Sequence, residues 1–142
     1  MKTKLILRIA TLVILVHILG HIRGHAGWKT PKDPGQQEVV NQMLTNKAPF
    51  MGAVRSMGDY FEGYGQILTV VLVMMMAMTW IISGHAAQHP KIASTILAPL
   101  AGCFIAISVI EFIYFFAFAA SISLVAGVLI GVASWQLANV KI

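Results

Sequence analysis

Apolar residues fill four long stretches of the chain, and the charged residues fall mostly between them. The stretches cover residues 5–23, 63–84, 92–117 and 121–140. Each is long enough to cross the hydrocarbon core of a bilayer as a helix, which satisfies its own backbone hydrogen bonds there. The pattern therefore predicts an all-α fold, an integral membrane four-helix bundle formed by a single transmembrane domain over residues 1–142.

The connections between these helices differ greatly in length. Residues 118–120 separate the third helix from the fourth, and residues 85–91 separate the second from the third. Connections this short predict that helices two, three and four are antiparallel neighbours. The first connection, residues 25–62, is long enough to hold structure of its own.

The long connection carries two amphipathic patterns. Asp33 before Pro34 is typical of an N-cap followed by a proline at the first helical position, and apolar residues recur on one face after it. A second set of apolar residues follows after Pro49: Phe50, Met51, Val54, Met57 and Phe61. We therefore expect a short amphipathic cap between helices 1 and 2 that lies on the membrane surface or covers the bundle.

The composition excludes a soluble globular domain. Of 142 residues, 58% are apolar and 11% are charged, and the mean hydropathy is +0.79, whereas about a quarter of a soluble domain is charged. The net charge of +5 indicates contact with anionic lipid headgroups, and no basic stripe with interleaved aromatics indicates nucleic acid. The single cysteine, Cys103, excludes an intrachain disulfide and a CxxC pair.

The start of the chain has two interpretations. Lys2 and Lys4 before an apolar stretch are also typical of a signal peptide, but Arg8 interrupts the stretch and no A-x-A site follows, which favours a membrane helix.

The orientation in the membrane follows only weakly from the charges. The positive-inside rule gives equal numbers of cations on both sides, and Lys2 and Lys4 favour cytoplasmic N- and C-termini. We expect a multi-pass membrane protein.

Three of the five histidines, His17, His21 and His25, repeat every four residues in the first predicted helix. At about 100° per residue they form one stripe along that helix. Gly20 and Gly24 border the stripe, and small residues four positions apart let a second helix approach closely. We therefore expect the histidines to face a helix contact rather than lipid.

Glu111 is the one acidic residue within the apolar cores of the last three predicted helices. A charge at the centre of the bilayer costs about 2.5 to 3.5 kcal/mol on insertion scales and marks a functional site by default. Because helix three returns toward the membrane face where helix one ends, Glu111 should lie at the height of His17 to His21. Asp59 and Glu62 lie close to that face as well.

Three interpretations of this polar cluster remain open. It binds a lipophilic molecule such as a quinone or relays protons, with these candidate residues: His17, His21, Glu111, Tyr64 and Tyr114. Alternatively, the protein is a metal-dependent membrane enzyme that holds Zn²⁺ or Fe²⁺ through His17, His21, His25, Glu62 and Glu111. In the third, Glu111 only locks the bundle through a hydrogen bond to a histidine of helix one.

The remaining histidines and the methionines have simpler interpretations. His85 and His89 lie near the opposite membrane face and are typical of a C-terminal cap of helix two. Two histidine groups at opposite depths exclude a transmembrane b-type haem. The run Met74, Met75 and Met76 indicates packing rather than a copper site, because consecutive residues point around the helix. Gly58, Gly63 and Gly65 predict close packing where helix two begins.

Two sequence segments carry a family resemblance. LILRIATLVILVHILGH, followed by a long amphipathic connection and DYFEGYGQILTVVLVMMMAMTWIISG, resembles small four-helix bacterial membrane proteins of the DoxX-like group, in a branch with a His-x-x-x-His first helix. The resemblance implies a role in quinone-linked sulfur oxidation or as a membrane partner of redox enzymes, and it assigns no catalytic residue. It also implies the bacterial inner membrane and favours an accessory subunit with a redox protein as partner. Small four-helix bundles often assemble further, so a second copy of the chain is another candidate partner.

Overall fold

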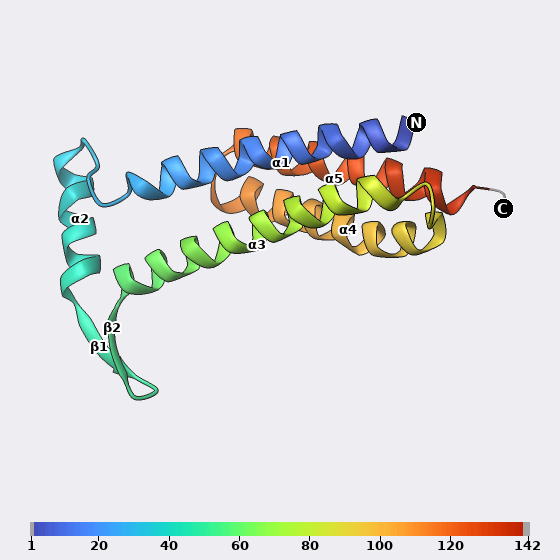
Figure 1. The fold of residues 1–142 in the computed structure, drawn as a ribbon. Helices are drawn as coiled ribbons and strands as arrows, with labels where there is room; N and C mark the ends of the chain where they lie inside the picture. Colours follow the sequence, from blue (N-terminus) through green and yellow to red (C-terminus); the bar gives the residue numbers. More distant parts are fainter. Residues whose placement is uncertain (1, 141–142) are drawn as a thin grey trace. The chain divides into compact units, whose positions relative to one another are not determined.

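The structure, a computed structural model, describes residues 2–140, which form five helices and one two-stranded sheet. In chain order the elements are α1 Lys2–Ala26, α2 Pro34–Thr45, β1 Lys47–Phe50, β2 Ala53–Ser56, α3 Met57–His85, α4 Pro90–Tyr114 and α5 Ala117–Ala138 (Figure 1). Four of these helices, α1, α3, α4 and α5, are long and apolar enough to cross a membrane. The predicted all-α membrane fold with four long helices is confirmed.

The ends of the long helices lie near the predicted ends, with one clear exception. α3 begins at Met57 rather than at residue 63. Its start is fixed by a reciprocal pair: the Ser56 backbone N–H donates to Asp59 Oδ2 at 2.8 Å, and the Asp59 N–H donates to Ser56 Oγ at 3.1 Å. This is the capping-box arrangement, which satisfies two N–H groups at a helix start. As a result Asp59 and Glu62 belong to the helix instead of to the preceding connection.

The chain forms two compact units, and the first contains residues 2–18 and 72–140. Within it α4 and α5 lie side by side (Figure 1), joined at Phe115 and Phe116. A Cβ on Gly127 of α5 would lie only 3.2 Å from the backbone oxygen of Ala101 in α4, so the two helices approach as closely as a glycine permits. Small residues at such contacts are typical of packed membrane helices.

The core of the first unit is built from the inward faces of all four long helices. Its fully buried side chains include Leu7, Ile14, Leu72, Leu97, Phe104 and Ile130. Many apolar side chains on the outward faces are exposed, among them Leu12, Val109, Val125 and Val128. An apolar core beneath an apolar outer surface is expected where lipid replaces water as the solvent.

The second unit contains residues 19–71, which include the end of α1, α2, the hairpin and the start of α3. The Asp33 side chain caps α2 by accepting a hydrogen bond from the Gln36 N–H at 2.9 Å, which confirms the predicted helix start. β1 and β2 pair as an antiparallel hairpin. Its turn residues, Met51 and Gly52, have φ angles of 47° and 82°, as a tight hairpin turn requires.

Three predictions about local structure are wrong. The apolar set after Pro49 was expected to form an amphipathic stretch, and its first part instead forms the hairpin, because the turn at Gly52 reverses the chain. No atom lies within 4 Å of a Cβ built on Gly20 or Gly24, so the contact expected at that pair is absent from the described residues. His89 is the N-cap of α4 rather than a cap of α3, and its side chain makes no capping hydrogen bond.

Candidate functional site

The first unit buries three polar side chains that contact one another in a closed ring: His17 of α1, Glu111 of α4 and Ser123 of α5. His17 Nε2 lies 3.0 Å from Glu111 Oε1. Ser123 Oγ donates to Glu111 Oε2 at 2.6 Å and lies 3.1 Å from His17 Nδ1. The three residues are 5%, 7% and 0% exposed, respectively. We refer to this ring as the buried triad.

Helical periodicity places each member of the buried triad on the inward face of its helix. His17 continues the buried positions of α1, and Glu111 continues those of α4. Ser123 lies on the buried face of α5, three residues after Ala120. Because α4 and α5 run antiparallel on either side of a two-residue break, Glu111 and Ser123 lie within two turns of the same end of the pair.

The three contacts of the buried triad fix how many hydrogens it holds. Ser123 has one hydroxyl hydrogen, and it is donated to Glu111. In that direction of donation, His17 Nδ1 carries a hydrogen and donates to Ser123 Oγ. The contact between His17 Nε2 and Glu111 Oε1 needs one more hydrogen, on either atom. With that hydrogen on nitrogen the pair is an imidazolium and a carboxylate, and with it on oxygen both groups are neutral.

The triad consequently has no net charge in either arrangement. The two arrangements differ in the position of one hydrogen along the 3.0 Å contact between His17 Nε2 and Glu111 Oε1. Both keep every hydrogen bond of the ring. Loss of that hydrogen would break one contact and leave a buried negative charge, which is costly in a low-dielectric interior. Chemically, the triad can hold one transferable proton between a histidine and a carboxyl group.

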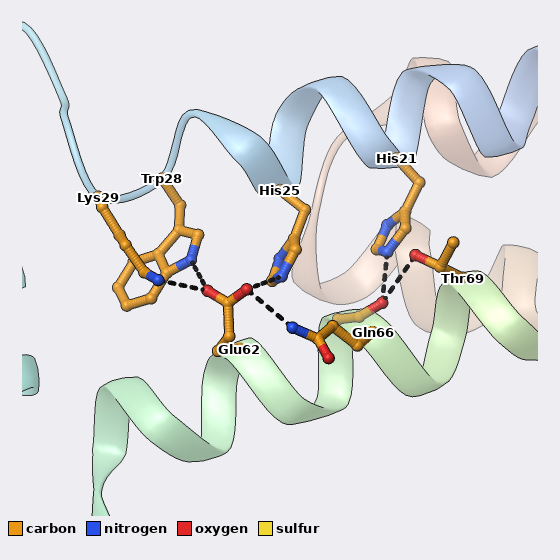
Figure 2. A network of polar contacts seen from close by, with 8 residues as sticks. His21, His25, Trp28, Lys29, Glu62, Gln66 and Thr69 are labelled. Carbon is orange, nitrogen blue, oxygen red and sulfur yellow. Dashed lines mark hydrogen bonds and ion pairs between the residues drawn. The ribbon is translucent and has the colours of Figure 1, made fainter.

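The second unit gathers a different set of polar side chains around Glu62 (Figure 2). Lys29 Nζ and Trp28 Nε1 donate to Glu62 Oε2 at 2.9 and 3.1 Å. Gln66 donates to Oε1 at 3.1 Å. His25 Nε2 lies 3.4 Å from Oε1, although the angle does not suit a hydrogen bond. This Glu62 cluster pairs one carboxylate with one lysine and is only partly buried.

His21 contacts backbone rather than a carboxylate. Its Nε2 lies 2.9 Å from the Gly65 carbonyl oxygen, which also accepts from Thr69 Oγ1 at 3.0 Å (Figure 2). Because a carbonyl only accepts, His21 Nε2 carries a hydrogen. A Cβ on Gly65 would overlap the His25 ring, so this position needs glycine. Close packing is confirmed at Gly65 and at Gly58, whereas nothing lies within 4 Å of a Cβ on Gly63.

The structure divides the predicted site residues among several places. His17 and Glu111 meet, which confirms the predicted pairing of Glu111 with a histidine of the first helix. His21 and His25 belong to the second unit, together with Glu62. Tyr64 and Tyr114 are 70% and 76% exposed and belong to neither cluster.

The residues expected as metal ligands do not fit a metal centre. No group of three or more His, Cys, Asp or Glu side chains within residues 2–140 is placed to hold a metal ion. His17 and Glu111 lie in one unit, whereas His21, His25 and Glu62 lie in the other. Both ring nitrogens of His17 already contact protein oxygens. A metal would have to displace Ser123 or Glu111 from this histidine.

Sequence reasoning missed several residues that the structure brings into these clusters. Ser123 lies within an apolar stretch, and its only signal was its place among small residues at helical spacing. Trp28 and Lys29 lie just past the end of α1, within the stretch interpreted as a connection. Arg8, regarded only as an interruption of the first helix, stacks over the ring of Trp80 at 3.1 Å from its centroid.

Comparison with protein-family models, with curated proteins and with solved structures gave no match.

Proposed function

We propose that this protein is a multi-pass protein of the bacterial inner membrane, with cytoplasmic N- and C-termini, that serves a membrane redox system as an accessory subunit. In this proposal the buried triad exchanges protons with a lipophilic hydrogen carrier of the quinone class. The observation that carries the proposal is the closed ring of contacts among His17, Glu111 and Ser123, which can hold one proton at either of two atoms.

The hydrogen bonds of the buried triad favour proton exchange over direct binding of a ligand by these three residues. Every side-chain nitrogen and oxygen of the three residues already has a partner within the ring. A ligand that bound directly would have to replace one of these partners. Proton transfer between His17 and Glu111 requires no such replacement, and a histidine beside a carboxyl group is a common acid and base pair.

An exposed aromatic surface adjoins Glu111 in the sequence and supports the lipophilic part of the proposal. It lies at the junction of α4 and α5 and consists of Phe112, Tyr114, Phe115, Phe116 and Phe118, all at least 60% exposed. Aromatic side chains stack on planar rings, and the Tyr114 hydroxyl adds a polar group for orientation. Quinones take up protons on reduction and release them on oxidation, so a nearby proton donor suits this class of molecule.

Infrared difference spectroscopy of the protein in liposomes tests proton exchange directly. A protonated carboxyl group and a carboxylate absorb at different frequencies, and the chain has only three glutamates. We expect reduction of an added quinone to produce a carboxyl band that disappears in Glu111→Gln and shifts in His17→Gln. Glu38→Gln is the matched control, because Glu38 is exposed on α2 and should leave the band unchanged. A band that survives in Glu111→Gln would contradict the proposal.

A second measurement tests the carrier and the partner. Protein purified in mild detergent from bacterial membranes would be extracted and its quinone content measured, while co-purifying proteins are examined for haem and flavin. We expect quinone to be retained by the wild type and lost in Phe115→Ser combined with Phe116→Ser. The same quinone content in both proteins, without any redox partner, would leave only the structural role, in which the triad locks three helices together.

A further inference from the structure

A groove of about 540 Å³ lies at the N-terminal end of α1, in the first unit and away from the buried triad. It is lined by Lys2, Lys4, Leu5 and Arg8. Three of these four side chains are cations, and the fourth is an exposed leucine. A groove with this lining is matched to a ligand that is anionic at one end and apolar at the other.

Arg8 is held in the groove in a way that leaves part of its guanidinium without a partner. Its Cζ lies 3.1 Å from the centroid of the Trp80 ring, so the plane is fixed by a cation–π contact. Its Nη1 is buried and has no hydrogen-bond partner among residues 2–140. A buried charged donor without an acceptor is destabilising. An anion from outside the chain that reached the partly exposed remainder of the Arg8 side chain would offset this cost.

The described residues of the first unit offer no carboxylate for this purpose. Within residues 2–18 and 72–140, Glu111 is the one acidic side chain, and it is bound to His17 and Ser123. The first turn of α1 holds no acidic residue either. The free N–H groups of a helix start add further attraction for an anion. Lys2, Lys4 and Arg8 therefore form a cationic site without a counter-ion among the described residues of the first unit.

We propose that this groove binds the phosphate group of an anionic phospholipid. Arg8 donates to a phosphate oxygen, Lys2 and Lys4 supply the surrounding positive charge, and Leu5 and Trp80 contact the acyl region. A lipid rather than free phosphate is favoured because exposed Leu5 of α1 lines the groove and Arg8 stacks on half-exposed Trp80 of α3. Both helices are long and apolar enough to cross a membrane. Basic groups at a helix end on the cytoplasmic side commonly bind anionic headgroups.

Native mass spectrometry of the full-length protein in detergent tests the site with three probes: phosphatidylglycerol, phosphatidylethanolamine and inorganic phosphate. We expect phosphatidylglycerol to bind the wild type at least about tenfold more tightly than phosphatidylethanolamine, as a charge-assisted contact of more than 1.4 kcal/mol predicts. Arg8→Gln should remove most of this preference, and Arg8→Lys should restore only part of it, because lysine lacks the planar fork. Lys47→Gln, which changes an exposed cation of β1, should have no effect.

A second variant keeps the test decisive if Arg8→Gln does not fold. Lys2 and Lys4 are exposed and part of neither polar cluster, so Lys2→Gln combined with Lys4→Gln should fold normally. Each cation near the membrane surface contributes about 1 kcal/mol, so this pair should weaken phosphatidylglycerol binding by about 25-fold or more. Equal binding of the two lipids by the wild type, or phosphatidylglycerol binding that is unchanged in both variants, would overturn the proposal. Displacement of the lipid by inorganic phosphate would identify a free-phosphate site instead.

Discussion

Replacing Glu111 by glutamine should leave the stability of the protein nearly unchanged, whereas replacing it by leucine should not. A glutamine amide can complete the ring: its NH₂ donates to His17 Nε2, His17 Nδ1 donates to Ser123 Oγ, and Ser123 donates to the amide oxygen. These are the contacts that the structure places at 3.0, 3.1 and 2.6 Å. The ring needs no charge, so the neutral amide should fit.

The expected difference follows from the contacts that leucine removes. Glu111→Leu leaves His17 Nε2 and Ser123 Oγ without their carboxylate partner in a site that is almost fully buried. Hydrogen bonds within membrane proteins contribute about 0.6 kcal/mol on average and up to about 1.7 kcal/mol each. The loss of both should therefore lower the free energy of unfolding by about 1 to 3 kcal/mol. Glu111→Gln should stay within about 0.5 kcal/mol of the wild type.

Reversible unfolding in mixed micelles, followed by circular dichroism, measures both free energies. Glu38→Gln again controls for the general effect of losing a carboxylate, since Glu38 is exposed. If glutamine is as destabilising as leucine, the ring depends on a full negative charge, and the count of hydrogens that makes it neutral is wrong. If neither variant is destabilised, the triad contributes nothing to stability and the structural role can be discarded.

Three further predictions concern local contacts. Gly127→Ala should be less stable than Gly102→Ala by about 1 to 3 kcal/mol in the same unfolding assay, because a Cβ at Gly127 meets the α4 backbone and one at Gly102 meets nothing within 4 Å. Gly65→Ala should shift the imidazole NMR signals of the second unit, where a Cβ overlaps a histidine ring, and Gly63→Ala should leave them unchanged. Asp33→Ala should speed amide exchange in the first turn of α2 by about fivefold, as the loss of about 1 kcal/mol of capping predicts, and unchanged exchange would refute that capping role.

The membrane helices could be predicted because length and apolarity alone determine them. The first turns of α3 were missed because Asp59 and Glu62 made the segment too polar to count as a membrane helix. The hairpin was missed because Met51 occupies a turn position with positive φ, and methionine is not a residue that indicates such a turn. In both places short-range capping and turn geometry, rather than hydrophobic periodicity, decide the structure.

The candidate site was predictable only in part. Antiparallel topology and helix rise placed Glu111 at the height of His17, and that contact is present. The same reasoning could not predict that the three histidines of the stripe have different partners, because residues four apart on one helix share a face whatever packs against them. His21 Nε2 contacts the Gly65 backbone carbonyl in the second unit, and a pattern of side chains does not indicate a backbone partner. Ser123 carried only the weak signal of small residues at helical spacing, and serines are common in packed membrane helices.

Arg8 and His17 are separated by nine residues on α1, or about 14 Å along the helix at 1.5 Å per residue. Substitutions that far apart normally have additive effects on stability. Arg8→Gln combined with Glu111→Gln should therefore change the free energy of unfolding by the sum of the single changes when no lipid is added. Measuring the two single variants and the double variant again with phosphatidylglycerol separates the two proposals. If the change in the double variant still equals the sum of the single changes, the lipid groove only anchors the chain. A departure of more than about 0.5 kcal/mol would mean that lipid binding at Arg8 alters the triad, and the infrared band of Glu111 should then move when phosphatidylglycerol is added.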